Sequence, residues 1–214
     1  MSRPKSYRLL CPIARALDRV GDRWTLLIVR DLHAGPARFG ELQSALPGLA
    51  SNLLSSRLVD LEREGLVARV DNAYQLTEAG QATAPLLFEL AAFGSRFAPP
   101  VDPKRPGNLR LVAVTLKEAL RRVVDDSSRL EVELIVDDEA FFIEAAEGNV
   151  TVRYGSAPSA PLAVETDYEA MIAIGDGALS SAQFAKDHVR VSRGTRKAAR
   201  QFLSLLGAAF SPGA

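Results

Sequence analysis

Residues 51–77 have the sequence SNLLSSRLVDLEREGLVARVDNAYQLT, and the first half of this stretch has a helical pattern. Its leucines recur at the i, i+4, i+7 spacing of an amphipathic helix: Leu54, Leu58 and Leu61. Serine is a favoured helix cap, and glycine often follows a helix end. We therefore expect a helix over residues 51–64, with Ser51 as its cap and Gly65 as its stop.

The second half of the same stretch has the pattern of a β-hairpin. Residues 66–70 and 73–76 are short runs separated only by Asp71 and Asn72. Aspartate and asparagine tolerate the positive φ angles that the tightest hairpin turns require. We expect two short strands joined at this pair.

The residues around this stretch extend the pattern. Apolar spacing predicts three shorter helices upstream, over about 11–20, 24–32 and 39–46. Downstream, Thr77 is expected to cap one long helix that reaches about residue 97. Two helices joined by a short turn and followed by a hairpin are the order of a winged helix-turn-helix domain.

In a helix-turn-helix domain the second helix of the motif lies in the major groove, and here that helix is 51–64. Its leucines would face the core, which leaves short polar side chains toward a partner. Asparagine pairs with adenine, arginine with guanine or phosphate, and serine with either. The candidate DNA-binding residues are Arg38, Ser51, Asn52, Ser55, Ser56 and Arg57. A structural helix tolerates the same polar run, so periodicity alone leaves both interpretations open.

The charge of the chain is zero overall but uneven along it. Residues 1–107 carry 14 Lys and Arg against 11 Asp and Glu, whereas residues 108–214 carry 12 against 15. Seven of the basic residues lie among the first 30. A local basic patch suits contact with phosphate, although a solvated helix face has the same composition.

Composition excludes several other classes of protein. A single cysteine cannot form an internal disulfide, and no apolar run approaches the roughly 20 residues of a membrane span. Charged residues interrupt any N-terminal secretion signal, so a cytoplasmic protein without a membrane partner is expected. With two histidines, one cysteine and no nucleotide or nucleophile motif, we expect no metal, cofactor, catalytic residue or enzymatic activity.

Several blocks of the first half resemble the HxlR-type winged-helix regulators. They are CPIARAL (11–17), GDRWTLLIVRDL (21–32), GP with RFGEL (35–42), LSSRL with LEREGLV (54–67) and YQLTEAG (74–80). The resemblance covers about residues 9–97. It implies a bacterial homodimeric transcription regulator that binds double-stranded DNA, with dimer contacts from regions 7–20 and 80–97.

Two positions stand out against this family. Members usually carry several more wing residues, often prolines and basic residues, where this chain has only Asp71 and Asn72. In some members a cysteine at the position of Cys11 senses oxidants or electrophiles, so the resemblance makes Cys11 a candidate redox sensor. A helix N-terminus and nearby arginines favour the reactive thiolate. The alternative for Cys11 is a small residue buried at a dimer contact.

A proline-rich segment divides the chain. Four prolines and a glycine among residues 98–107 cannot continue a helix or a central strand. We therefore expect a DNA-binding and dimerisation domain over 1–98, a linker over 99–107 and a second domain over 108–214. In the second domain, apolar residues alternate with polar ones from residue 130 to 136. This alternation begins a series of predicted strands, which helices follow. The fold class is α+β, with an antiparallel sheet backed by helices.

Blocks of the second domain resemble a sterol-carrier-protein-type domain. They are VDDEAF (136–141), GNVTVRYG (148–155), VETD (164–167), GALSSA (177–182) and VRVS (189–192). The resemblance implies an apolar tunnel for a small hydrophobic ligand that would modulate DNA binding. The candidate ligand-binding residues are Phe142, Tyr154, Met171, Ile172, Phe184, Phe202 and Leu206.

Two alternatives remain for the second domain and for the chain. These seven residues could be ordinary core, and the domain could serve dimerisation or docking. The alternative for the whole chain is a ligand-carrying or partner-docking module whose helix-turn-helix is vestigial.

Overall fold

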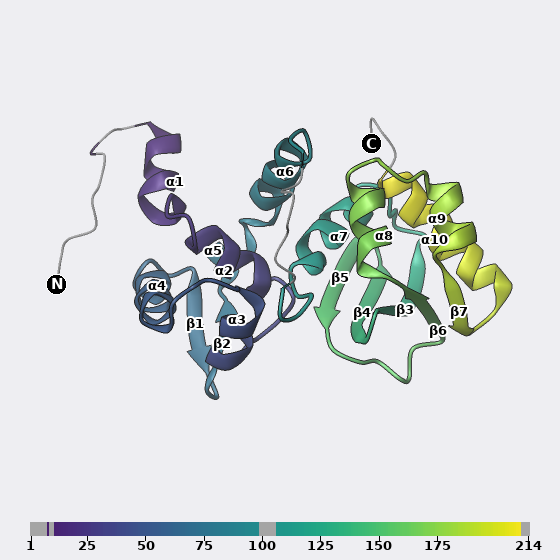
Figure 1. The fold of residues 1–214 in the computed structure, drawn as a ribbon, viewed down its shortest axis with the longest axis horizontal. Helices are drawn as coiled ribbons and strands as arrows, with labels where there is room; N and C mark the ends of the chain where they lie inside the picture. The colour runs from purple at the N-terminus through teal and green to yellow at the C-terminus, as the bar shows by residue number, and fades with distance from the viewer. Residues whose placement is uncertain (1–7, 9–10, 99–105, 211–214) are drawn as a thin grey trace. The chain divides into compact units, whose positions relative to one another are not determined.

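A computed structural model describes residues 8, 11–98 and 106–210, which form two compact units (Figure 1). Unit 1 comprises Met1–Leu87 with Asp102–Leu111, and unit 2 comprises Phe88–Val101 with Val112–Ala214. The chain therefore first passes between the units inside a helix, and residues 108–111 lie in unit 1. Most of the expected linker, residues 99–105, lies outside the described residues.

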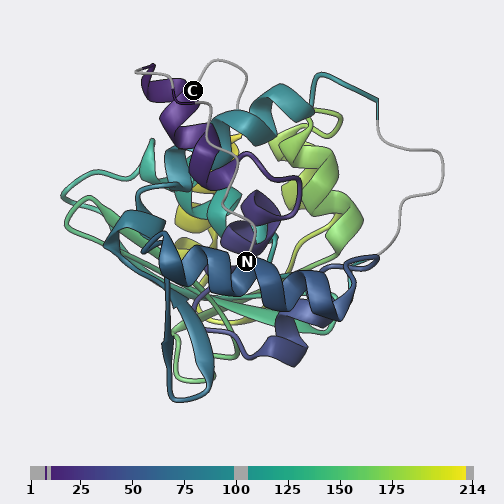
Figure 2. The ribbon, with the colours of Figure 1, turned by 90° about the vertical axis from the view of Figure 1, so that its left-hand side faces the viewer.

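Unit 1 has the predicted order of a winged helix-turn-helix domain. Its elements are α1 (Pro12–Val20), α2 (Thr25–Leu32), α3 (Phe39–Ala45), α4 (Ser51–Arg63), β1 (Val67–Val70), β2 (Ala73–Leu76), α5 (Glu78–Gln81) and α6 (Ala84–Gly94), which continues into unit 2. Figure 2 shows α4, in blue, and the β1–β2 hairpin on the side of this unit that faces the viewer. The three leucines of the α4 stripe are almost fully buried, which confirms the predicted core face.

The predicted hairpin turn is confirmed by its backbone. Asp71 and Asn72 have φ angles of 48° and 65°. Positive φ at both central positions is the requirement of the hairpin turn whose twist matches that of the flanking strands. Val70 consequently pairs with Ala73, and Val67 with Leu76.

Two details of unit 1 were predicted wrongly. Ala50, not Ser51, is the N-cap of α4, because Ala50 is still extended and Ser51 is already helical. The long helix expected after Thr77 is two helices, α5 and α6. Thr77 does cap α5 by accepting from Gly80 N at 3.2 Å. The break follows because Pro85 has no N–H to donate to the carbonyl four residues earlier.

Unit 2 is a five-stranded sheet with helices. Its remaining elements are α7 (Val112–Arg121), β3 (Arg129–Val136), β4 (Glu139–Ala146), β5 (Asn149–Tyr154), β6 (Leu162–Thr166), α8 (Tyr168–Gly175), α9 (Ser181–Asp187), β7 (Arg190–Arg193) and α10 (Arg196–Ala209). The strand order is β5-β4-β3-β6-β7. The expected α+β class is confirmed.

The expectation of a wholly antiparallel sheet was wrong, because β6 runs parallel to β3. Strands β3, β4 and β5 form an antiparallel meander, so β5 also runs in the direction of β3. Residues 155–161 must therefore return the chain along the strands and across the sheet before β6 begins. We call residues 155–161 the crossover loop.

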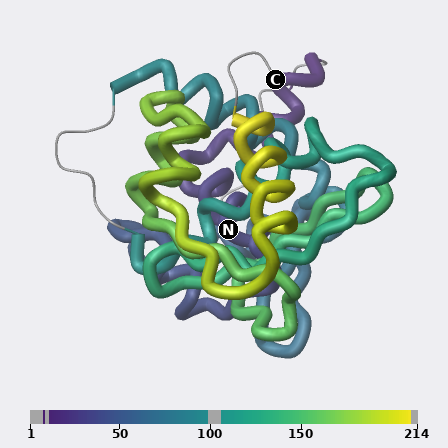
Figure 3. Tube along the Cα trace, turned by 90° about the vertical axis from the view of Figure 1, so that its right-hand side faces the viewer, coloured from purple at the N-terminus to yellow at the C-terminus, as the bar shows by residue number. Residues whose placement is uncertain are grey.

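The two faces of this sheet differ. One face carries apolar residues such as Val132, Leu134 and Ile143, which are buried. Helix α7 contacts β5, and α10 contacts α7, α9 and β6; Figure 3 shows α10 in yellow. The opposite face carries the alternate residues, among them Glu133 and Phe142, and we call it the loop face because the crossover loop lies on it. No helix in the described ranges is long and apolar enough to cross a membrane.

Candidate functional site

Helix α4 separates its polar residues from its core residues as predicted. Ser51, Asn52, Ser55 and Ser56 are all exposed, opposite the buried leucine stripe. Residues four apart on a helix are neighbours on its surface, so these four side chains form one patch. We call it the α4 polar patch. Its hydroxyl and amide groups can donate to and accept from base edges or phosphates.

Arg57 differs from the residues of this patch because its side chain is bonded to two carboxylates of the protein. Its Nη2 donates to Asp22 Oδ2 at 2.9 Å and its Nη1 to Asp60 Oδ2 at 3.1 Å. The guanidinium is half-buried, and it ties α4 to the turn that precedes α2. Burial alone would raise the pKa of Asp22, but hydrogen bonds from Trp24 N and from Arg57 lower that pKa below its ordinary value.

Arg38 lies at the start of α3, the first helix of the motif, with its side chain exposed. Its backbone N–H donates to the Glu41 carboxylate at 2.6 Å, which fixes the backbone at this helix end. The Arg38 side chain is therefore held at one end by an ordered backbone and can reach a phosphate.

The wing carries an exposed arginine that was not among the candidate residues. Arg69 is exposed on β1, beside the turn, and its Nη2 donates to Asn72 Oδ1 at 3.2 Å. Its guanidinium lies 5.7 Å from the centre of the Tyr74 ring. The cation next to the Asp71-Asn72 turn was the available signal in the sequence.

Helices α1 and α6 each expose more than one large apolar side chain. On α1 they are Ile13 and Leu17, and on or just after α6 they are Leu86, Leu90, Phe93 and Phe97. These positions lie in the regions expected to form a dimer. Cys11, directly before α1, is a free and exposed thiol.

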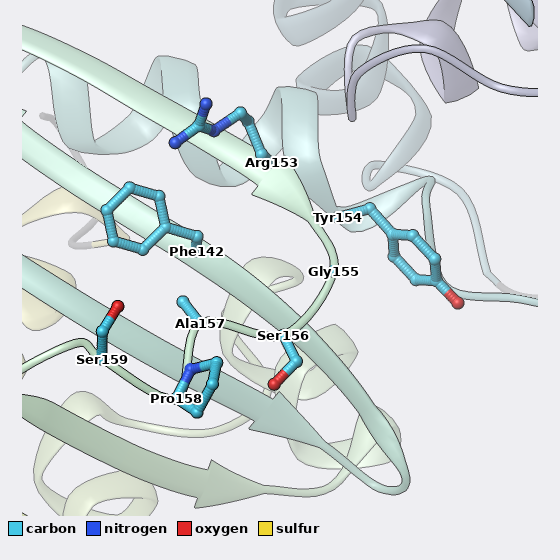
Figure 4. A pocket seen from close by; sticks show the side chains of 8 residues that line it. All are labelled: Phe142, Arg153, Tyr154, Gly155, Ser156, Ala157, Pro158 and Ser159. Carbon is cyan, nitrogen blue, oxygen red and sulfur yellow. The ribbon is translucent and has the colours of Figure 1, made fainter.

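The structure separates the seven candidate ligand residues of unit 2. Four are buried side chains of helices α8, α9 and α10: Met171, Phe184, Phe202 and Leu206. Ile172 is exposed. Phe142 and Tyr154 both line one pocket, but they lie on opposite faces of the sheet, because Tyr154 pairs with Phe141 and Phe142 pairs with Arg153. Figure 4 shows the Tyr154 ring pointing away from Phe142.

Two helices joined by a turn, with a polar exposed second helix and a following two-stranded hairpin, define a winged helix-turn-helix DNA-binding domain. The chain belongs to the HxlR-like helix-turn-helix family, whose profile matches residues 19–102. This confirms the resemblance found in the first half of the sequence. The sterol-carrier-type resemblance of the second half stays a prediction.

Similar proteins are HTH-type transcriptional regulators. The chain is 39% identical over 99 residues to YvaP of Bacillus subtilis strain 168, covering 42% of this chain and 92% of YvaP. It is 34% identical over 101 residues to YodB of the same strain, covering 44% of this chain and 90% of YodB. The crystal structure of quinone-bound YodB matches with 35% identity and a TM-score of 0.39, covering 41% of this chain and 100% of that chain. The sequence relatives identify this chain as a regulator of the DNA-binding HTH type.

Proposed function

We propose that this chain binds double-stranded operator DNA as a homodimer in the bacterial cytoplasm, regulates transcription and catalyses no reaction. The observation that carries the proposal is the α4 polar patch, which lies exposed on the second helix of the motif. Short polar side chains on that helix are suited to read base edges in the major groove.

The candidate residues divide into three roles in this proposal. Asn52 and the serines of the α4 polar patch contact bases. Arg38 contacts phosphate, which positions a protein on the duplex without carrying sequence information. Arg57 would have to leave both Asp22 and Asp60 to reach a base, so its role is to hold α4 in position.

Exposed apolar side chains support the homodimer. Ile13 is 71% exposed and Phe97 is 63% exposed. Large apolar side chains that gather on helix faces mark interaction surfaces more often than single ones do. A symmetric dimer formed by α1 and α6 would place two copies of α4 on half-sites one helical turn, or a multiple of it, apart.

A fluorescence-anisotropy titration with DNA from upstream of the chain's own gene tests this function. Asn52→Ala should weaken specific binding by about 1–3 kcal/mol, roughly five- to 150-fold, if Asn52 pairs with a base. Ser204→Ala, an exposed serine on α10, is the matched control and should leave affinity unchanged. Equal affinity for operator and unrelated DNA, with Asn52→Ala silent, would instead favour a docking module with a vestigial helix-turn-helix.

Unit 2 is the proposed sensor, in which a small ligand modulates DNA binding. A separate sheet unit, the sterol-carrier-type resemblance and a pocket of about 360 Å³ support this role. Modulation requires that the ligand bind the DNA-competent and incompetent states with different affinity. The alternative role, dimerisation or docking through a filled core, predicts no ligand uptake.

Cys11 is a second proposed control point. Its exposed thiol precedes α1, one of the two helices that support the dimer. Diamide should then change operator affinity in the wild type but not in Cys11→Ser. Identical behaviour of the two proteins would leave Cys11 as a small residue at the dimer contact.

A further inference from the structure

A pocket of about 360 Å³ lies against the loop face of unit 2 (Figure 4). Phe142 of β4 and Arg153 of β5 form one wall, and the first half of the crossover loop forms the other. The lining residues are Phe142, Arg153, Tyr154, Gly155, Ser156, Ala157, Pro158 and Ser159. Its size is near the lower end of the roughly 300–1,000 Å³ of small-molecule sites.

The loop wall of this pocket is fixed by a buried carboxylate. Glu133 is only 5% exposed, and it accepts from Ser156 Oγ at 2.6 Å and from Ala157 N at 2.8 Å. Arg193 Nη2 also donates to Glu133, at 2.8 Å, and Arg193 Nε donates to the Ala160 carbonyl at 2.8 Å. Both ends of the pocket-lining segment are therefore held to the sheet.

The strand register explains how Arg193 reaches Glu133. Glu133 pairs with Ala163, and Ala163 pairs with Arg193, so one small residue separates the two charges on the loop face. A methyl group leaves room for the arginine to extend across β6. Arg193 balances the negative charge of Glu133. Glu133 therefore does not oppose an anion in the pocket.

Arg153 supplies the positive charge of the pocket. It is exposed, and its guanidinium lies 5.1 Å from the centre of the Phe142 ring. Among the described residues, no carboxylate forms an ion pair with Arg153 within 4.0 Å. Other arginines of the sheet differ, since Arg190 pairs with Glu165 and Arg193 with Glu133. The Arg153 guanidinium is thus available to a ligand.

We infer that this pocket binds a small, planar, aromatic anion, with its carboxylate on Arg153 and its ring against Phe142 and Pro158. Guanidinium matches a carboxylate with two parallel hydrogen bonds, and an aromatic ring packs on an aromatic or proline face. The inference rests on the proposed sensor role of unit 2 but moves the ligand. It lies on the loop face and is charged, whereas the sequence led us to expect an apolar ligand; of the seven candidate residues, Phe142 and Tyr154 line this pocket.

Calorimetric titration of the full chain with 2-naphthoate, and with its uncharged counterpart 2-naphthamide, tests this site. Wild type should bind 2-naphthoate saturably and 2-naphthamide at least about tenfold more weakly. Arg153→Gln should lose roughly ten- to 100-fold affinity for 2-naphthoate, the usual range for a hydrogen bond to a charged group. It should leave 2-naphthamide unchanged. Phe142→Ala should weaken the binding of both compounds.

Controls separate a local effect from a folding defect and from DNA binding. Arg190→Gln removes a paired arginine from the same sheet and should not alter 2-naphthoate affinity. Amide NMR shifts on titration should cluster at residues 142, 153–157 and 159. Shifts confined to helices α8, α9 and α10, undiminished affinity in a folded Arg153→Gln, or no saturation at millimolar 2-naphthoate would each overturn the inference. The titration contains no DNA, so loss of operator binding does not affect it.

Discussion

At the residue scale, Arg57 shows that a sequence pattern can place a residue on a helix face without revealing its partners within the fold. Periodicity placed it on the polar side of α4, where an arginine suggests a base contact. Its partner Asp22 lies 35 residues earlier in the chain, and nothing in the local pattern links the two. The same limit applies to Glu133. The alternation of apolar residues places it on the exposed face of its strand, but it is buried because the crossover loop covers it.

Arg57→Ala should therefore lower stability more than it changes the sequence preference for DNA. Two half-exposed ion pairs at one guanidinium contribute about 1 kcal/mol, since exposed pairs are screened by solvent. Urea unfolding of Arg57→Ala measures this loss, and Arg63→Ala, whose pair is more exposed, is the control. A relaxed operator preference with unchanged stability would return Arg57 to a reading role.

We expect the stability of unit 2 to depend on pH through Glu133. The hydrogen bond from Ser156, together with those from Ala157 N and Arg193, lowers the pKa of Glu133 below its ordinary value of 4.5 against the opposing effect of burial. A lowered folded-state pKa stabilises the protein above the unfolded pKa, and this contribution is lost as pH falls through the folded pKa. The thermal midpoint should thus fall on acidification below about pH 4.5. Glu133→Gln should be less stable at pH 7 and should show a flatter decline.

At the element scale, the features that the sequence predicted correctly are those that nearby residues determine. The α4 stripe, the Asp71-Asn72 turn and the Thr77 cap all depend on residues within one or two turns of chain. The parallel pairing of β6 with β3 depends on where the crossover loop returns, and this is not encoded in the period of either strand. The same reason explains why the ligand candidates were not brought together.

The wing tests how a short element contributes to DNA binding. Arg69→Ala should weaken binding similarly on all sequences and lower the salt slope by about one, as expected for a phosphate contact. Asp71→Asn should have the opposite sign, because it removes a negative charge and keeps a residue type that tolerates the positive φ at this turn. Anisotropy titrations at several salt concentrations measure both. If both variants bind like wild type, the wing does not reach the DNA.

At the scale of the whole molecule, residues 106–111 belong to unit 1, whereas the sequence assigned them to the linker and the second domain. Arg110 is 2% exposed, and it donates to the backbone carbonyls of Asp31, Gly35 and Pro36 within unit 1. Gly107 N donates to the Ser44 carbonyl at 3.1 Å. The chain then enters unit 2 at Val112. This passage between the units therefore follows directly on an anchored segment of the DNA-binding domain.

Through Arg110, the anchored segment is hydrogen-bonded to the turn before α3, so it can couple a ligand in unit 2 to the DNA-binding helices. Coupling is reciprocal: if 2-naphthoate changes operator affinity by some factor, operator DNA must change 2-naphthoate affinity by the same factor. Arg110→Lys keeps the buried charge but cannot span three carbonyls, and it should reduce this factor toward one while both binding events persist. Gly107→Ala should act similarly, because its Cβ would lie 2.3 Å from the Ser44 carbonyl oxygen.

Lengthening the chain elsewhere provides the matched control for this coupling. A Gly-Ser insertion within residues 99–105 leaves the anchored residues and the entry into unit 2 unchanged, so it should preserve the coupling factor. Calorimetry of 2-naphthoate with and without operator DNA measures the factor from one side, and anisotropy with and without 2-naphthoate measures it from the other. If Arg110→Lys keeps full coupling and the insertion abolishes it, residues 99–105 transmit the signal. The anchored segment then serves only to stabilise unit 1.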